Sequence, residues 1–227
     1  MPLSYKQIIQ MVVRELGKPD YLEIGVKEGL SFLPVEAKRK IAVDPEFKFD
    51  YRKNGKENEI YHEITSDEYF ATRNDNIDGV IFIDGLHTCS QVLRDIDNAL
   101  KCMTSESVIM VDDTSPLKDT EAVAAKNIDD AARIVGPSFD LSWCGDVWKA
   151  IAITRATATD LHVFTVQGHR GLTFITRGDP ESVLSIPVEE ILSADYKYLS
   201  DARDKILNMK DNAYMEEWLI GKKTTAR

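Results

Sequence analysis

Short apolar runs alternate with amphipathic stretches along most of the chain, and this alternation predicts an α/β fold. Two of the runs, within Asp78–His87 and Ser107–Thr114, are rich in Val and Ile and end in aspartate. Apolar runs of this length are typical of strands buried on both faces of a parallel sheet. Three further strands are expected earlier in the chain, at Tyr21–Gly25, Lys40–Asp44 and Ile60–Ile64.

Helices are expected between the strands, because apolar residues recur there at helical spacing. Ser4 and Gln7 can form a capping box before an apolar stripe that ends at Gly17. Thr88 and Gln91 can do the same between the two aspartate-ending strands. That segment therefore reads as a strand-helix-strand unit of about the expected ~30 residues.

The second half of the chain predicts two more helices and a β-hairpin, so the sheet should end in an antiparallel strand. The expected elements are a helix from a cap at Asp119 or Thr120 to Gly136-Pro137, a helix that follows Trp143–Lys149 and runs to Thr154, and two strands at Leu161–Val166 and Leu172–Arg177.

From Gly178 onward the composition changes to charged, helical segments, at Val188–Leu192, Asp195–Met209 and Asn212–Ile220. We therefore expect an α/β domain over residues 1–178 and a C-terminal helical extension over residues 179–227. The extension is expected to pack back on the same core. Covering a ligand site and forming a homodimer contact are the alternatives.

Composition narrows the classes of protein that the chain can represent. With 227 residues, 43% of them hydrophobic, the chain can bury one sizeable core. The net charge of −10 argues against nucleic acid or an anionic membrane as the main partner. Three cysteines without metal or redox spacing fit reduced thiols in the cytoplasm. No run approaches the ~20 apolar residues of a membrane span, so we expect a cytoplasmic protein.

A glycine turn follows the first expected strand. It reads Glu23-x-Gly25-x-x-x-Gly29, which is not the Gly-x-Gly-x-x-Gly pattern of dinucleotide binding. Asp44 ends the second strand about 20 residues after Glu23, where a carboxylate can accept hydrogen bonds from ribose hydroxyls. Only residues 30–39 separate the turn from that strand, which predicts a truncated helix there.

Two segments near the glycine turn leave alternatives open. Residues 45–59 are polar but contain three aromatic side chains. We interpret them as a surface loop, with a mobile loop near a cofactor as the alternative. Ser66 lies in an expected helix start whose polar groups could reach an adenine, and helix capping explains them equally well.

Three carboxylates are expected at one edge of the sheet. Asp84 and the pair Asp112-Asp113 follow neighbouring parallel strands, and the carboxyl ends of such strands meet at the same edge. Their mutual repulsion is relieved by protonation or by a cation, and oxygen ligands favour Mg²⁺, with Mn²⁺ as an alternative. Taken singly, each aspartate is better explained as a cap of the helix or turn that follows it. His87, three residues after Asp84, favours the functional interpretation.

Taken together, these motifs resemble the metal-dependent, class I S-adenosylmethionine-dependent O-methyltransferases. The resemblance rests on the following residues: Tyr21–Gly29, Asp44, Asp84-Gly85-x-His87, Asp112-Asp113 and Gly145–Lys149. It covers roughly residues 20–178 and is strongest for macrocin- and mycinamicin-type sugar O-methyltransferases and related bacterial glycan methyltransferases. Catechol O-methyltransferase is a more distant match.

The resemblance implies a Rossmann-like sheet, mostly parallel with an antiparallel final strand and with helices on both faces. It implies that Asp84, Asp112 and Asp113 hold Mg²⁺ and that His87 is the general base. The implied residues of the S-adenosylmethionine site are Glu23, Gly25, Gly29, Asp44, Ser66 and Asp84. Thr114 departs from the pattern, because an aromatic residue often follows the acidic pair in these families.

The leading hypothesis is therefore methylation of a hydroxyl group on a sugar, a glycan or another small molecule with vicinal oxygens. An oxidoreductase with a nucleotide cofactor is the rival enzyme class, although residues 25–29 supply no pyrophosphate turn. A non-catalytic binding protein on the same fold is the third. For His87 the competing interpretation is a capping residue or one that orients a metal ligand.

Overall fold

The computed structural model describes residues 3–17, 19–73 and 76–225, and their contacts divide the chain into two compact units. The first unit contains the chain up to Gly85, Arg94–Met110 and the residues from Ala213 onward. The second contains Leu86–Leu93 and Val111–Asn212. These units differ from a division at residue 178, so the domain boundary expected from composition stays a prediction.

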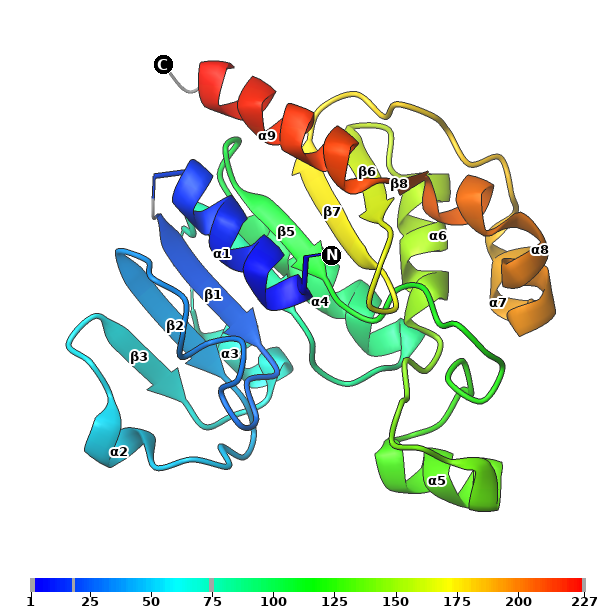
Figure 1. Ribbon diagram of the computed structural model, residues 1–227, viewed down its shortest axis with the longest axis horizontal. Coiled ribbons are helices and arrows are strands. Elements are labelled where there is room, and N and C mark those ends of the chain that lie inside the picture. Colours follow the sequence, from blue (N-terminus) through cyan, green and yellow to red (C-terminus); the bar gives the residue numbers. More distant parts are fainter. Residues whose placement is uncertain (1–2, 18, 74–75, 226–227) are drawn as a thin grey trace. The chain divides into compact units, whose positions relative to one another are not determined.

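The first unit is built on a parallel sheet in the strand order β3-β2-β1-β4-β5 (Figure 1). The pairings β1 with β2, β2 with β3 and β1 with β4 are all parallel. Its strands are β1 (Asp20–Ile24), β2 (Arg39–Val43), β3 (Glu59–His62), β4 (Gly79–Ile83) and β5 (Val108–Val111). Every residue of β4 and β5 is buried, which confirms the interpretation of unalternated apolar runs as doubly covered strands.

Helix α1 (Tyr5–Glu15) of the first unit begins where the sequence signals predicted, whereas helix α2 (Tyr51–Asn54) lies in a segment expected to be a loop. Ser4 forms the expected capping box with Gln7 at the start of α1. The ring of Tyr5 stacks on that of Phe82 in β4, with 6.3 Å between the ring centroids. The other helices are α3 (Ser66–Thr72), α4 (Cys89–Cys102) and α9 (Asn212–Thr225); α4 and α9 each have residues in both units.

One expectation for the first unit was wrong and another was incomplete. Residues 25–38 contain turns and no helix; the positive-φ glycines Gly25 and Gly29, together with Pro34, prevent the truncated helix that was expected. Residues 45–59 are mostly exposed, as expected of a surface segment, but they contain helix α2. Their aromatic side chains, led by Phe47 with 8% of its area exposed, pack on one another and on Tyr61 of β3.

The second unit carries the predicted hairpin. Strands β6 (Leu161–Val166) and β7 (Leu172–Arg177) are antiparallel, with Leu161 opposite Arg177. The two-residue strand β8 (Met209–Lys210), which the sequence pattern did not predict, pairs with β6 in parallel. The fold is thus Rossmann-like, mostly parallel with an antiparallel strand β7, as expected.

Helices α7 (Val188–Ser193) and α8 (Tyr196–Leu207) of the predicted extension pack on α6 (Val147–Thr157) within the second unit. Arg155 of α6 is only 5% exposed, and its guanidinium donates to the carbonyl oxygens of Lys205 and Ile206 at the end of α8. Helices α7 and α8 of the extension therefore pack back on the rest of the second unit, as expected. Each helix in the described ranges is too short or too polar to span a lipid bilayer.

Helix α5 (Ile128–Val135) begins later than expected, with Asn127 as its cap instead of Asp119 or Thr120. The reason lies in Glu121, which is 2% exposed, accepts a hydrogen bond from the Leu117 amide and forms an ion pair with Arg170. These bonds hold the preceding residues in turns. The helix ends at Gly136, as predicted, and a short 3₁₀ turn, η1 (Gly136–Ser138), follows.

Candidate active site

The glycine turn after β1 is tied to the end of β2 by Asp44. One carboxylate oxygen of Asp44 accepts from the Lys27 amide at 2.9 Å and the other from the Glu46 amide at 2.8 Å. At Gly25, with φ +89°, an added Cβ would lie 2.0 Å from the carbonyl oxygen of Asp84. Only glycine therefore allows the turn to pass the end of β4, and the first unit brings the predicted residues Gly25, Asp44 and the Asp84 backbone together.

Glu23 belongs to β1, directly before the glycine turn, and has no exposed area. Its carboxylate accepts hydrogen bonds from the Tyr21 hydroxyl at 2.5 Å and from the Ser31 hydroxyl at 2.6 Å. Burial raises the pKa of Glu23 to about 8. Through these bonds Glu23 stabilises the turn from its buried side. Ser66, another residue predicted for the cofactor site, is half-buried and is the first residue of α3, directly after the capping residue Thr65.

We expect Glu23→Gln to flatten the pH dependence of stability. Because the folded-state pKa of about 8 lies above the ordinary 4.5, the stabilising effect of the proton is complete below pH 4.5. It is lost as the pH rises toward 8, at up to about 1.4 kcal/mol per pH unit. Urea unfolding from pH 5 to 8 should show this slope in the wild type and in the control Glu28→Gln, an exposed residue of the same turn. An unchanged slope in Glu23→Gln would contradict the assignment.

His87, in the second unit, is held in one tautomer. Its Nδ1 lies 2.6 Å from the carbonyl oxygen of Trp143, and a carbonyl can only accept, so Nδ1 carries a proton; in the neutral ring the lone pair is therefore on Nε2. The same Nδ1 lies 3.7 Å from Oδ2 of Asp113. The side chains of His87 and Asp113 are 17% and 23% exposed. The imidazole of His87 and the carboxylate of Asp113 are therefore close together, and both remain partly accessible to solvent.

Asp113 follows β5 in a left-handed conformation, with φ +54°. Aspartate tolerates this conformation better than most residues, and such backbone strain is common at functional sites. The Cys144 thiol donates to its Oδ1 at 3.6 Å, and burial raises the pKa of that thiol, so the sulfur keeps its proton. Asp112, the preceding residue, is half-buried.

Thr114 occupies the position where an aromatic residue was expected from the resemblance. It has no exposed area, and its hydroxyl accepts from Thr173 at 2.9 Å; Thr173 in turn lies 2.7 Å from the Thr165 hydroxyl. This buried chain of hydroxyl groups joins the end of β5 to the β6–β7 hairpin.

Residues 143–146, a segment of Trp, Cys, Gly and Asp, hold the His87 region in four ways. The Trp143 carbonyl accepts from His87, and the Cys144 thiol donates to Asp113. Gly145 packs so tightly on the His87 backbone that an added Cβ would lie 1.8 Å from the His87 carbonyl oxygen. Oδ1 of Asp146 accepts from the Cys89 amide at 2.6 Å, at the start of α4.

The 143–146 segment is itself fixed by Glu121, whose carbonyl accepts from the amides of Cys144 and Gly145. Sequence reasoning singled out Gly145 and Asp146 but gave them no contact with His87. The sequence signal that could have pointed to this contact is Gly145, which lies between Cys144 and Asp146 just before an apolar helix. Thr88 caps α4 as predicted, by accepting from the Gln91 amide.

Asp84 belongs to the first unit, where its amide donates to the Ile24 carbonyl at 2.8 Å. It is half-buried directly after β4 and lies three residues before His87. Three residues of extended chain span at most about 11 Å, so covalent connection alone keeps Asp84 near His87. Joint metal binding by Asp84, Asp112 and Asp113 stays a prediction.

Comparison with known proteins agrees with this fold. Residues 22–114 match a family model described as a methyltransferase domain. The structure is similar to the methyltransferase PaMTH1 of Podospora anserina bound to S-adenosylhomocysteine, with 15% identity, a TM-score of 0.55, and 77% of this chain and 78% of that chain covered. No curated protein matches the sequence.

Two O-methyltransferases are also similar. That of Bacillus cereus, in complex with S-adenosylhomocysteine, has 17% identity and a TM-score of 0.53, covering 77% of this chain and 82% of that chain. TomG of Streptomyces achromogenes, involved in tomaymycin synthesis and in complex with S-adenosylmethionine, has 17% identity and a TM-score of 0.52, with 76% and 79% covered. The chain thus has the Rossmann-like methyltransferase fold, and its residues 22–114 are similar to the methyltransferase domain family.

Proposed function

We propose that this chain is a Mg²⁺-dependent O-methyltransferase that methylates a hydroxyl group of a sugar, a glycan or another small molecule with neighbouring oxygens. The observation that carries the proposal is the setting of His87: its Nδ1 bonds to the Trp143 carbonyl and lies 3.7 Å from Asp113 Oδ2, which leaves Nε2 of the neutral ring as the proton acceptor. The family match over residues 22–114 supports methyl transfer as the reaction class.

The residues proposed to hold S-adenosylmethionine lie in the first unit. Gly25 and Gly29, both with positive φ, shape the turn that is proposed to lie against the ligand; an added Cβ would meet Asp84 at Gly25 and the Leu33 and Phe49 side chains at Gly29. Each Asp44 oxygen accepts one amide hydrogen and keeps a second lone pair for a ribose hydroxyl. Glu23 supports the turn through Ser31, and Ser66 is the proposed polar group near the adenine. When bound, S-adenosylmethionine supplies a methyl group made electrophilic by its positively charged sulfur.

Asp84, Asp112 and Asp113 are proposed to hold Mg²⁺, or alternatively Mn²⁺. Carboxylate oxygens are the ligands that these cations prefer. Asp113 fits this role because its oxygens are oriented by the Cys144 thiol while its side chain stays 23% exposed. A bound divalent cation supplies positive charge that favours ionisation of a nearby hydroxyl group.

His87 is the proposed general base. The acceptor oxygen forms a bond to the methyl carbon as the methyl–sulfur bond breaks, and that electron pair stays on sulfur. The hydroxyl proton passes to Nε2 of His87. Asp113 Oδ2, 3.7 Å from Nδ1, then stabilises the imidazolium ion, and the 143–146 segment keeps the ring oriented throughout.

Calorimetry and chelation test the proposal. We expect S-adenosylmethionine and S-adenosylhomocysteine to bind without metal. Excess EDTA should abolish any methyl transfer that a screen of free and nucleotide-linked sugars detects. Electron paramagnetic resonance of Mn²⁺ should show at least about tenfold weaker binding in Asp112→Asn and Asp113→Asn. The control Asp129→Asn, an exposed residue of α5, should bind Mn²⁺ normally.

Three results would count against it. Full turnover in excess chelator would contradict the proposed metal requirement. Binding of a reduced dinucleotide in place of S-adenosylmethionine would favour the oxidoreductase alternative. Absence of heat with both cofactors and with metal would favour a non-catalytic binding protein.

A further inference from the structure

A cavity of about 550 Å³ lies within the second unit, beside the 143–146 segment. Three separate parts of the chain line it: the turn around Ala122, the start of α6 and the junction between α7 and α8. Its volume is within the ~300–1,000 Å³ typical of small-molecule sites. We propose that this cavity binds the methyl acceptor, and that the acceptor is an uncharged, multiply hydroxylated molecule such as a glycoside; this rests on the proposed function.

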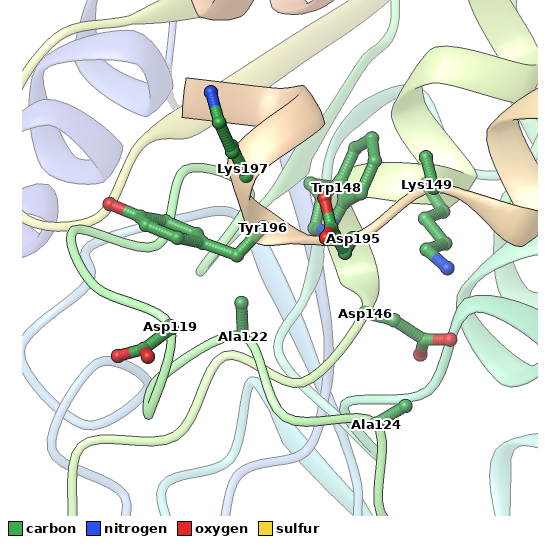
Figure 2. Close-up of a pocket in the computed structure, with 10 residues that line it drawn as sticks. Asp119, Ala122, Ala124, Asp146, Trp148, Lys149, Asp195, Tyr196 and Lys197 are labelled. Atoms are coloured by element: carbon green, nitrogen blue, oxygen red, sulfur yellow. The ribbon is translucent and has the colours of Figure 1, made fainter. Parts of the chain in front are cut away.

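The cavity adjoins the proposed base through Asp146. This residue lines the cavity, caps α4 at Cys89, and follows Gly145, which packs on the His87 carbonyl. Figure 2 shows Asp146 and Lys149 on one side of the cavity and Asp119 and Tyr196 on the other. A molecule bound here therefore lies next to the loop that carries His87.

The polar groups of the cavity favour hydroxyl groups as partners. Three carboxylates line it, and each uses Oδ1 to accept a backbone amide: Asp119 from Thr120, Asp146 from Cys89 and Asp195 from Tyr198. These bonds fix the direction of the carboxylates. Within the described part of the chain no partner is recorded for Oδ2 of any of the three, so these oxygens can accept hydrogen bonds from ligand hydroxyls.

The charges argue for an uncharged ligand. Two ammonium groups accompany the three carboxylates, and both have protein partners: Lys149 donates to the Leu192 carbonyl at 2.7 Å and Lys197 pairs with Asp201 at 2.6 Å. A phosphate or carboxylate on the ligand would meet more negative than positive charge and would displace existing bonds. Alanine side chains, including Ala122 and Ala194, leave the remaining space open.

The α7–α8 junction is held rigidly enough to serve as one wall. The Tyr196 hydroxyl donates to the Leu117 carbonyl at 2.5 Å, and Arg203 donates to the Ser115 hydroxyl at 2.6 Å. Both contacts reach the residues that follow Asp113. The C-terminal helices would thereby set acceptor specificity, which develops the alternative that the extension covers a ligand site.

The test uses the full chain, isotope-labelled for NMR, with methyl α-D-mannopyranoside and methyl α-L-rhamnopyranoside as probes and glucose 6-phosphate as the charged comparison. We expect the two glycosides, but not the phosphate, to shift the backbone amides of Ala122, Asp195 and Lys197. Ala194→Phe should abolish these shifts by filling the cavity. Thr159→Phe, an exposed change outside it, should not.

Kinetics separate the cavity from the reaction itself. Asp119→Asn and Asp195→Asn keep the Oδ1 acceptor but convert the second oxygen to an amide donor. We therefore expect KM for the glycoside to rise about tenfold, which corresponds to about 1.4 kcal/mol, with S-adenosylmethionine affinity unchanged. Methyl transfer with unaltered KM in Ala194→Phe, or amide shifts absent with both glycosides, would overturn the cavity assignment. Cavity shifts without any turnover would overturn the proposed function and leave the binding site standing.

Discussion

His87→Asn should lower kcat by roughly 10²- to 10⁴-fold, the usual contribution of a general base, while S-adenosylmethionine affinity stays within about twofold. Asparagine is chosen because its amide nitrogen can replace Nδ1 and keep the bond to the Trp143 carbonyl. The substitution therefore removes Nε2 alone. The remaining activity should rise with pH, because hydroxide can replace the missing base.

His169→Asn is the matched control, since His169 is an exposed residue of the β6–β7 turn; it should keep wild-type kcat and pH profile. Mn²⁺ titration of His87→Asn distinguishes the two roles considered for His87. Unchanged metal affinity, with residual activity that now simply rises with pH, supports the base. Weaker metal binding with an unchanged pH profile would instead make His87 a residue that positions a metal ligand.

Gly145→Ala should be the most damaging small substitution in the second unit. Its Cβ would lie 1.8 Å from the His87 carbonyl oxygen, so the 143–146 segment or the His87 loop must move. The left-handed backbone, with φ +59°, adds a cost of roughly 1–2 kcal/mol. We expect a total destabilisation of about 3 kcal/mol or more and a loss of kcat that persists at temperatures where the variant remains folded.

Gly17→Ala separates the two causes of that loss. Gly17 also has a positive φ, +84°, but an added Cβ there meets no atom within 4 Å. Urea unfolding should therefore show only the backbone cost of about 1 kcal/mol, with kcat unchanged. If Gly145→Ala and Gly17→Ala changed stability and kcat by the same amounts, the close approach of Gly145 to His87 would not contribute to activity.

Much of the fold could be predicted from local pattern. The apolar runs of β4 and β5 and the caps at Ser4 and Thr88 all occur where expected. The helix missing from residues 25–38 has a local explanation in Gly25, Gly29 and Pro34. The other two differences share one physical reason, which is that tertiary contacts outweighed local propensity. Glu121 holds residues before Asn127 in turns, and aromatic packing on Tyr61 orders the segment that was expected to be a surface loop.

For the candidate site, residue types and spacing singled out His87, Asp113 and Asp44 as candidates, because strand ends and glycine turns are local features. Their environments were not readable in the same way. Glu23 was expected beside the cofactor, yet its carboxylate is enclosed by Tyr21 and Ser31. Nothing within a few positions of Glu23 specifies whether its side chain faces ligand or core.

The linear chain therefore specifies which groups can act, and folding specifies which atoms they present. Periodicity and turn chemistry depend on neighbours within about four positions, so strands, caps and acidic strand ends are encoded locally. The tautomer of His87 depends on a carbonyl 56 positions away, and the proposed acceptor cavity joins segments 119–124, 146–149 and 194–197. Such contacts arise only when packing brings distant segments together, which is why the three-dimensional structure alone decided them.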